Sequence, residues 1–207
     1  MEEKKYKITG DVVNDRVTNV DNFHDYNIHV PTRTIYFGKE VSEFGSDVDE
    51  VDCQSAAQLI KNLLILKNYS NNYITLYLNT TGGSWEDGMA VYDIIKTLEA
   101  PVRIIGIGKI YSMGSVIMQA ADSRIMTKNA TMMIHDGTSG YVADSKSSEA
   151  WSDFSKDIRH IMYKIYYNKM IKINPKITLK EIEDMCSHDR IFSASEAKEV
   201  GLIDVVI

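Results

Sequence analysis

Short apolar strands alternate with amphipathic helices along residues 34–135, and this alternation limits the fold more than any other feature of the 207-residue chain. Residues 73–79 (YITLYLN) and 102–108 (VRIIGIG) predict strands, and each leads through a turn into a segment with helical spacing. Strands that are separated by helices pair in parallel, and almost wholly apolar strands suit a sheet covered on both faces. The pattern therefore predicts an α/β fold with a mainly parallel sheet.

The same periodicity rules predict the other elements. Helices are expected at residues 53–67, between the cap residue Ser84 and Pro101, at 112–121, at 149–171, near 178 and at 195–200, and short strands at 34–38, 124–127, 131–135, 191–192 and 203–207. Residues 1–30 are rich in charge and are expected to form a weakly ordered, flexible or axial N-terminal arm. A single domain is expected over residues 31–207.

Composition excludes several classes of protein. No apolar run approaches the roughly 18 residues that a membrane span needs, and the charged N-terminus lacks the apolar segment of a signal peptide. Two cysteines, Cys53 and Cys186, are too few for a disulfide scaffold and fit a reducing compartment. Residues 1–52 contain 12 acidic and six basic residues and the rest 17 of each, so no basic stripe for nucleic acid is present. We expect a cytoplasmic protein that binds neither nucleic acid nor membrane.

Two strand-to-helix junctions carry residues that could take part in catalysis or ligand binding. Ser112 follows a strand and opens a short apolar helix, but Ile110 stands where the G-x-S-x-G nucleophile turn has its first glycine. Taken alone, Ser112 is more simply a helix N-cap, and the Gly82-Gly83 pair an ordinary tight turn. Residues 106–109 lack the spacing of a phosphate-binding loop, which argues against nucleotide binding.

His135 differs from the other four histidines in its position. It ends the apolar strand MMIH and enters a glycine-containing loop, so it should lie at a sheet edge over a cleft. His24 and His29 lie in the polar arm, and His160 lies within the long amphipathic helix. No pair of histidines has the H-E-x-x-H spacing of a zinc site, and no metal site is expected.

Four motifs, in chain order, resemble the proteolytic subunit of the Clp protease, ClpP. They are TTGGSWEDGMAVY at residues 80–92, IYSMGS at 110–115, MMIHDG at 132–137 and DRIFSASEA at 189–197. The resemblance extends from about residue 34 to the C-terminus. It implies a crotonase-like α/β spiral of mainly parallel strands with flanking helices, and a protruding handle of strand or loop plus long helix at about residues 138–171.

The resemblance also implies roles for individual residues. Ser112, His135 and Asp189 match the positions of a serine-protease triad, with Ser112 as nucleophile, His135 as general base and Asp189 orienting the imidazole. The backbone amides of Gly83 and Met113 match the oxyanion hole. A tetrahedral oxyanion needs such preorganised donors, and a glycine turn and a helix start can supply them.

The assembly and partners are likewise expectations from the resemblance. It implies a heptameric ring or double ring that encloses polypeptide substrates, no cofactor, and ATP use only through a separate AAA+ unfoldase. The apolar positions of the long helix are expected to need a partner surface, since the helix is amphipathic and is expected to protrude. These positions are Ile158, Ile161, Met162, Ile165 and Tyr166.

Three of the places where the sequence departs from the family pattern bear on the site and the assembly. Thr81 replaces a proline before the two glycines, which loosens the turn but keeps both amides. Asp136-Gly137 replaces Gln-Pro after the histidine and changes the substrate groove. Ser187 and His188 replace an acidic residue and an arginine that pair between rings, so the pairing of two rings is in question.

Three other functions are compatible with the pattern. The same triad suits a phage head-maturation protease that trims capsid or scaffold protein without an unfoldase. A catalytically silent ring subunit is a second alternative, although such subunits typically lose a triad residue and this chain keeps all three. A crotonase-type acyl-CoA enzyme is the third and ranks last, because its chemistry does not need the Ser/His/Asp set.

Overall fold

The computed structural model describes residues 12–38, 40–41, 47–48, 50–137 and 145–207. Its main sheet has the strand order β1-β2-β6-β8-β10-β11, with β9 beside β8 and β12 beside β9. The strands are β1 (Ile28–His29), β2 (Thr34–Phe37), β6 (Ile74–Thr80), β8 (Val102–Tyr111), β9 (Ser123–Met126), β10 (Thr131–Ile134), β11 (Arg190–Ser193) and β12 (Val205–Val206). Among the described strands of this main sheet, only β1 and β11 join it by antiparallel pairing, so the predicted mainly parallel α/β sheet is confirmed.

Strand β8 belongs to two parts of the sheet. Residues 103–106 of β8 pair with β9, whereas residues 109–111 pair with β10. Between them Gly108 has a φ of 61°, and the register with β6 shifts beyond Leu78. A glycine tolerates this conformation without a side-chain clash. The bend at Gly108 separates the part of β8 that pairs with β9 from the part that pairs with β10.

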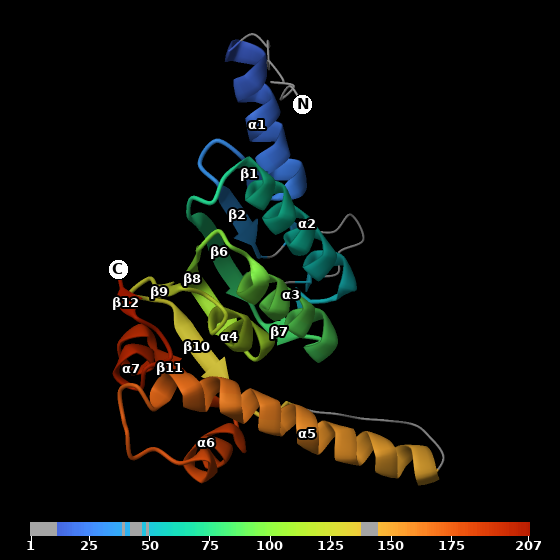
Figure 1. The fold of residues 1–207 in the computed structure, drawn as a ribbon, viewed down its shortest axis with the longest axis vertical. Helices are drawn as coiled ribbons and strands as arrows, with labels where there is room; N and C mark the ends of the chain where they lie inside the picture. Colours follow the sequence, from blue (N-terminus) through green and yellow to red (C-terminus); the bar gives the residue numbers. More distant parts are fainter. Residues whose placement is uncertain (1–11, 39, 42–46, 49, 138–144) are drawn as a thin grey trace, which may run out of the picture.

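Helices cover the sheet as the periodicity predicts (Figure 1). They are α2 (Cys53–Tyr69), α3 (Trp85–Thr97), α4 (Met113–Met118), α5 (Ser145–Met170), α6 (Leu179–Cys186) and α7 (Ala194–Glu199). The Ser84 hydroxyl caps α3 by accepting from the Asp87 amide at 3.3 Å, as predicted. All six residues of α4 are buried, so this helix lies inside the core. None of the helices in the described ranges is long and apolar enough to cross a membrane.

Residues 12–29, expected to belong to the N-terminal arm, contain regular elements. Helix α1 (Val12–Tyr26) and strand β1 occupy this region, and β1 pairs with β2 (Figure 1). The side-chain amide of the buried Asn62 in α2 donates to the Tyr26 carbonyl at 2.6 Å, which ties the end of α1 to the domain. Residues 1–11 lie outside the described residues.

The acidic connection before α2 also contains regular structure. Strands β3 (Glu40–Val41) and β4 (Asp47–Val48) form an antiparallel pair. Strand β5 (Glu50–Val51) runs parallel to β7 (Gly82–Gly83), so the glycine turn is itself hydrogen-bonded as a short strand. This pairing fixes the turn that precedes α3.

Helix α5 is both a core element and a projection (Figure 1). Met162, Ile165 and Tyr166 are buried in the core of the domain itself. The expectation that these three side chains need an outside partner is therefore wrong. Ile158 is partly buried, whereas Ile161 is 46% exposed. Nearer the start of the helix, the exposed rings of Trp151 and Phe154 contact each other edge to face. Residues 138–144 of the expected handle lie outside the described residues.

An ion pair joins the C-terminal segment to the sheet. The Arg124 guanidinium is nearly buried and donates to Asp204 through Nε and Nη2, and to the carbonyl of Gly201 at 2.8 Å. Burial alone would raise the pKa of Asp204, but its hydrogen bonds with Arg124 outweigh this effect and lower it. The stabilisation from Asp204 is therefore fully present above its ordinary pKa of 3.8 and is lost as the pH falls through the lower folded-state value.

Asp204→Asn should lower the free energy of unfolding at pH 7 by about 1–2 kcal/mol, because the Arg124 guanidinium then loses its charged acceptor. Denaturant unfolding across pH 2–7 measures the effect. The difference from wild type should begin to shrink below the ordinary pKa of 3.8 and be lost as the pH falls through the lower folded-state value, where Asp204 itself becomes protonated. Asp153→Asn, in the exposed pair with Lys156, is the control and should change little. Equal losses in the two variants would contradict the account.

Candidate active site

Ser112 lies where strand β8 passes directly into helix α4. Its backbone has a φ of 50° and a ψ of −120°, a conformation that few residues with a side chain adopt. Its N–H donates to the Met133 carbonyl at 2.9 Å, which fixes the turn against β10. The hydroxyl makes no capping hydrogen bond to α4, so the simpler interpretation of Ser112 as an ordinary N-cap is wrong.

The sheet register brings two further side chains to Ser112. Strands β8 and β10 are parallel neighbours, so Ser112 and His135, which follow them, lie at the same edge of the sheet. Strands β10 and β11 are antiparallel, with Ile134 opposite Arg190, which places Asp189 beside His135. Three residues that are distant in the sequence meet because of strand pairing alone.

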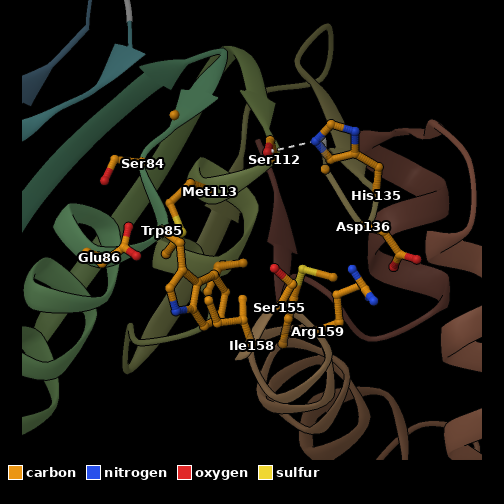
Figure 2. Close-up of a pocket in the computed structure, with 14 residues that line it drawn as sticks. Ser84, Trp85, Glu86, Ser112, Met113, His135, Asp136, Ser155, Ile158 and Arg159 are labelled. Atoms are coloured by element: carbon orange, nitrogen blue, oxygen red, sulfur yellow. Dashed lines mark hydrogen bonds between the residues drawn. The ribbon is translucent and has the colours of Figure 1, made fainter. Parts of the chain in front are cut away.

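The three side chains form a continuous line of hydrogen bonds. His135 Nε2 lies 2.8 Å from Ser112 Oγ (Figure 2), and His135 Nδ1 lies 2.9 Å from Asp189 Oδ1. Where the Asp189 carboxylate accepts at Nδ1, that nitrogen carries the ring proton, and Nε2 is left to accept from the Ser112 hydroxyl. The His135 side chain is 24% exposed and that of Asp189 68%, so the line runs from the cavity to the surface. This arrangement can move a proton from serine to histidine.

The glycine turn packs directly against Ser112. Gly82 has a φ of 100°, and a Cβ there would lie 2.5 Å from the Ser112 Cβ. Gly83 has a φ of 146°, and its Cβ would meet the Val51 carbonyl oxygen at 2.3 Å. Only glycine fits at either position. Gly83 and Met113, the two residues that the resemblance assigns to the oxyanion hole, line the same cavity as Ser112.

A cavity of about 340 Å³ opens beside Ser112 and His135. Figure 2 shows that one wall comes from α5, through Ser155, Ile158 and Arg159. This wall is not predicted from the sequence, where the α5 region is expected only as part of the handle. The one available signal was the spacing of these positions along a single helical face, and that spacing does not show what the face covers.

Asp136, which departs from the family pattern, also lines the cavity. The Tyr163 hydroxyl donates to Asp136 Oδ1 at 2.6 Å, and the Asp136 N–H donates to the Cys186 carbonyl at 2.7 Å. Burial, followed by the hydrogen bond to Asp136, raises the pKa of Tyr163, so its hydroxyl stays protonated. Burial, followed by the charge of Asp136, raises the pKa of the Cys186 thiol to about 12. Cys186 is therefore a neutral core residue and not a nucleophile.

Comparisons with known proteins identify a family. A family model described as Clp protease matches residues 46–207. The chain belongs to the Clp protease family. It is 32% identical over 160 residues to an ATP-dependent Clp protease proteolytic subunit of Deinococcus radiodurans, covering 76% of each chain. It is 34% identical over 165 residues to the subunit of Cyanophora paradoxa, covering 78% of this chain and 80% of the relative.

A third relative extends the likeness toward the N-terminus. The chloroplastic proteolytic subunit 3 of Arabidopsis thaliana is 32% identical over 200 residues, which cover 93% of this chain and 58% of the relative. Membership of the Clp protease family makes the protein a serine-type peptidase with the crotonase-like α/β fold. The predicted family and fold are confirmed.

Gly82→Ala should lower kcat for a peptide substrate by about 10²-fold, because the added methyl group displaces Ser112. Gly201→Ala is the matched control. It also places a methyl group at a positive φ, but against the side chain of Ile173. We expect it to lower the midpoint of thermal unfolding without changing the kcat of the folded protein. Wild-type kcat in Gly82→Ala would contradict the close packing at Ser112.

Proposed function

We propose that the protein is a serine endopeptidase that cleaves unfolded or extended polypeptides through a Ser112–His135–Asp189 triad. The observation that carries the proposal is the line of hydrogen bonds at 2.8 and 2.9 Å through the two nitrogens of His135. The strained backbone of Ser112 supports it, since strain at one serine beside a cavity is typical of a nucleophile. An intact line of bonds also favours an active subunit over a silent one.

Catalysis would proceed through an acyl-enzyme. His135 Nε2 takes the hydroxyl proton while Ser112 Oγ attacks the scissile carbonyl carbon, and Asp189 stabilises the imidazolium that forms. The same nitrogen then gives the proton to the leaving amine, and the C–N bond breaks. Water then gives a proton to His135 Nε2 and attacks the ester carbonyl carbon. The bond to Ser112 Oγ breaks, the proton returns to Ser112, and the product leaves with a free carboxyl group. These steps require only side chains and amides of the chain itself, so we propose that no cofactor takes part in them.

The oxyanion would be held by the backbone N–H groups of Gly83 and Met113. The amide of Met113 is the first of helix α4, and the first amides of a helix have no partner within it. The Gly83 amide belongs to the turn that packs against Ser112. Each such donor contributes about 3–4 kcal/mol to the stability of the transition state in comparable sites.

Substrate preference would come from the cavity beside Ser112. Its volume of about 340 Å³ suits one large side chain, and Met113, Val116 and Met162 give it an apolar floor. The extended substrate would bind by backbone hydrogen bonds, which do not depend on its side chains. We therefore propose modest selectivity, with an apolar residue preferred before the cleaved bond.

We further propose a homo-oligomeric ring, heptameric and single or double, that works with a separate AAA+ unfoldase in the cytoplasm. The relatives carry the name ATP-dependent Clp protease proteolytic subunit, which supports an ATP-using partner. The exposed Trp151 and Phe154 on the projecting part of α5 support burial against another copy. Ser187 and His188 replace the family's inter-ring ion pair, so a single ring or a weak double ring is included in the proposal.

Ser112→Ala should reduce hydrolysis of a fluorogenic apolar peptide by at least about 10³-fold and abolish labelling by a fluorophosphonate. Ser70→Ala, at the end of α2, is the control and should keep wild-type activity and labelling. Native mass spectrometry should find both variants assembled like wild type. Peptidase activity that persists in Ser112→Ala would refute the triad.

The native mass of the purified protein should be seven or fourteen times the subunit mass of 23.4 kDa. Trp151→Asp combined with Phe154→Asp should lower that mass, because two carboxylates cannot be buried at an apolar contact. Lys156→Glu, an exposed change on the same helix, serves as the control. A stable monomer at micromolar concentration would contradict the chamber.

A further inference from the structure

The carbonyl oxygen of Ser112 accepts three hydrogen bonds from the first turn of α4. The Ser115 N–H lies 2.9 Å away and the Val116 N–H 3.4 Å away. The Ser115 hydroxyl donates to the same oxygen at 2.6 Å, the shortest of the three. The peptide group between Ser112 and Met113 is therefore held by its oxygen.

Holding this oxygen also sets the direction of the Met113 N–H. A trans peptide group is planar, and its C=O and N–H point to opposite sides. Since the Ser112 oxygen points into the first turn of α4, the Met113 N–H points away from that turn. Met113 and Gly83 line the cavity with Ser112, so this is the N–H that would meet a substrate oxyanion.

A tyrosine from α5 completes the arrangement. The Tyr166 hydroxyl lies 2.7 Å from the Ser115 hydroxyl oxygen, and both side chains are fully buried. Ser115 has a single hydroxyl proton, which it gives to Ser112, so the Tyr166 O–H must donate to Ser115. Burial raises the pKa of Tyr166, which keeps the phenol protonated as a donor. The bonds run in one direction, from Tyr166 through Ser115 to the Ser112 carbonyl.

We propose that Ser115 and Tyr166 are positioning residues that orient the Ser112–Met113 peptide and thereby aim the Met113 amide at the oxyanion. The inference rests on the proposed function and adds two residues to it. Packing alone would not require this pair, because alanine and phenylalanine fill nearly the same space without burying two hydroxyl groups. The hydrogen bonds of the pair instead hold the Ser112–Met113 peptide group in one orientation.

Tyr166→Phe and Ser115→Ala should each lower kcat by about tenfold with little change in KM, since a misaligned oxyanion donor weakens the transition state and not the bound substrate. A peptide boronate, whose tetrahedral adduct imitates the oxyanion, should lose affinity by the same factor. Tyr167→Phe removes a hydroxyl from the neighbouring, partly buried position of α5 and should leave kcat unchanged. Thr97→Ala removes the same type of bond, to the Ile94 carbonyl in α3, and should also be neutral.

The double variant separates positioning from stability. Ser115→Ala alone leaves the Tyr166 hydroxyl buried without its acceptor and should lower the midpoint of thermal unfolding. Adding Tyr166→Phe removes the stranded hydroxyl, so the midpoint should recover while kcat stays at the level of the single variants, since both act through one line of bonds.

Two results would overturn the inference. One is a kcat that recovers together with the unfolding midpoint in the double variant. The other is wild-type kcat and boronate affinity in Tyr166→Phe. If Ser112→Ala is inactive in the same assays, either result refutes the positioning role alone. Activity in Ser112→Ala would refute the proposed function and this inference together.

Discussion

The positive φ of Ser112 is the constraint on which the rest of the site depends. A residue with a side chain adopts this conformation at a cost of about 1–3 kcal/mol, so the surroundings must hold it there. Strand β10 accepts its N–H through Met133, and Ser115 binds its carbonyl. Gly82 leaves room for its Cβ. The backbone of Ser112 is thus held by the sheet, the glycine turn and the buried helix together. Its hydroxyl faces His135.

Strand pairing supplies the other half of the geometry. Parallel pairing of β8 and β10 places Ser112 and His135 at one edge, and the antiparallel strand β11 returns the chain so that Asp189 reaches His135. Helix α5 lines the cavity, and its Tyr166 hydroxyl contacts the Ser115 hydroxyl beside Ser112. The helix whose first half projects from the domain therefore also contacts the residues that fix Ser112.

Much of this could be predicted from sequence, for identifiable reasons. Strands and helices were found because their apolar periodicity is local, and Ser112, His135 and Asp189 were found because the motifs that contain them resemble a known family. Ser112 alone resembled an N-cap, since only the fold shows its backbone angles. Helix α1 was missed because its sequence is polar and one of its ties is to Asn62, far along the chain. Periodicity marked Tyr166 as apolar-facing, but the bond to Ser115 depends on packing between distant segments.

A crystal structure of the protein after reaction with a peptide boronate would show whether the Ser112–Met113 peptide organises the site. We expect a covalent bond from boron to Ser112 Oγ, with one boronate oxygen about 3 Å from the amide nitrogens of both Gly83 and Met113. The carbonyl of Ser112 should still be bound by Ser115. A boronate attached elsewhere, or an adduct whose oxygens all point to solvent, would contradict the claim that the strained Ser112 peptide organises the site.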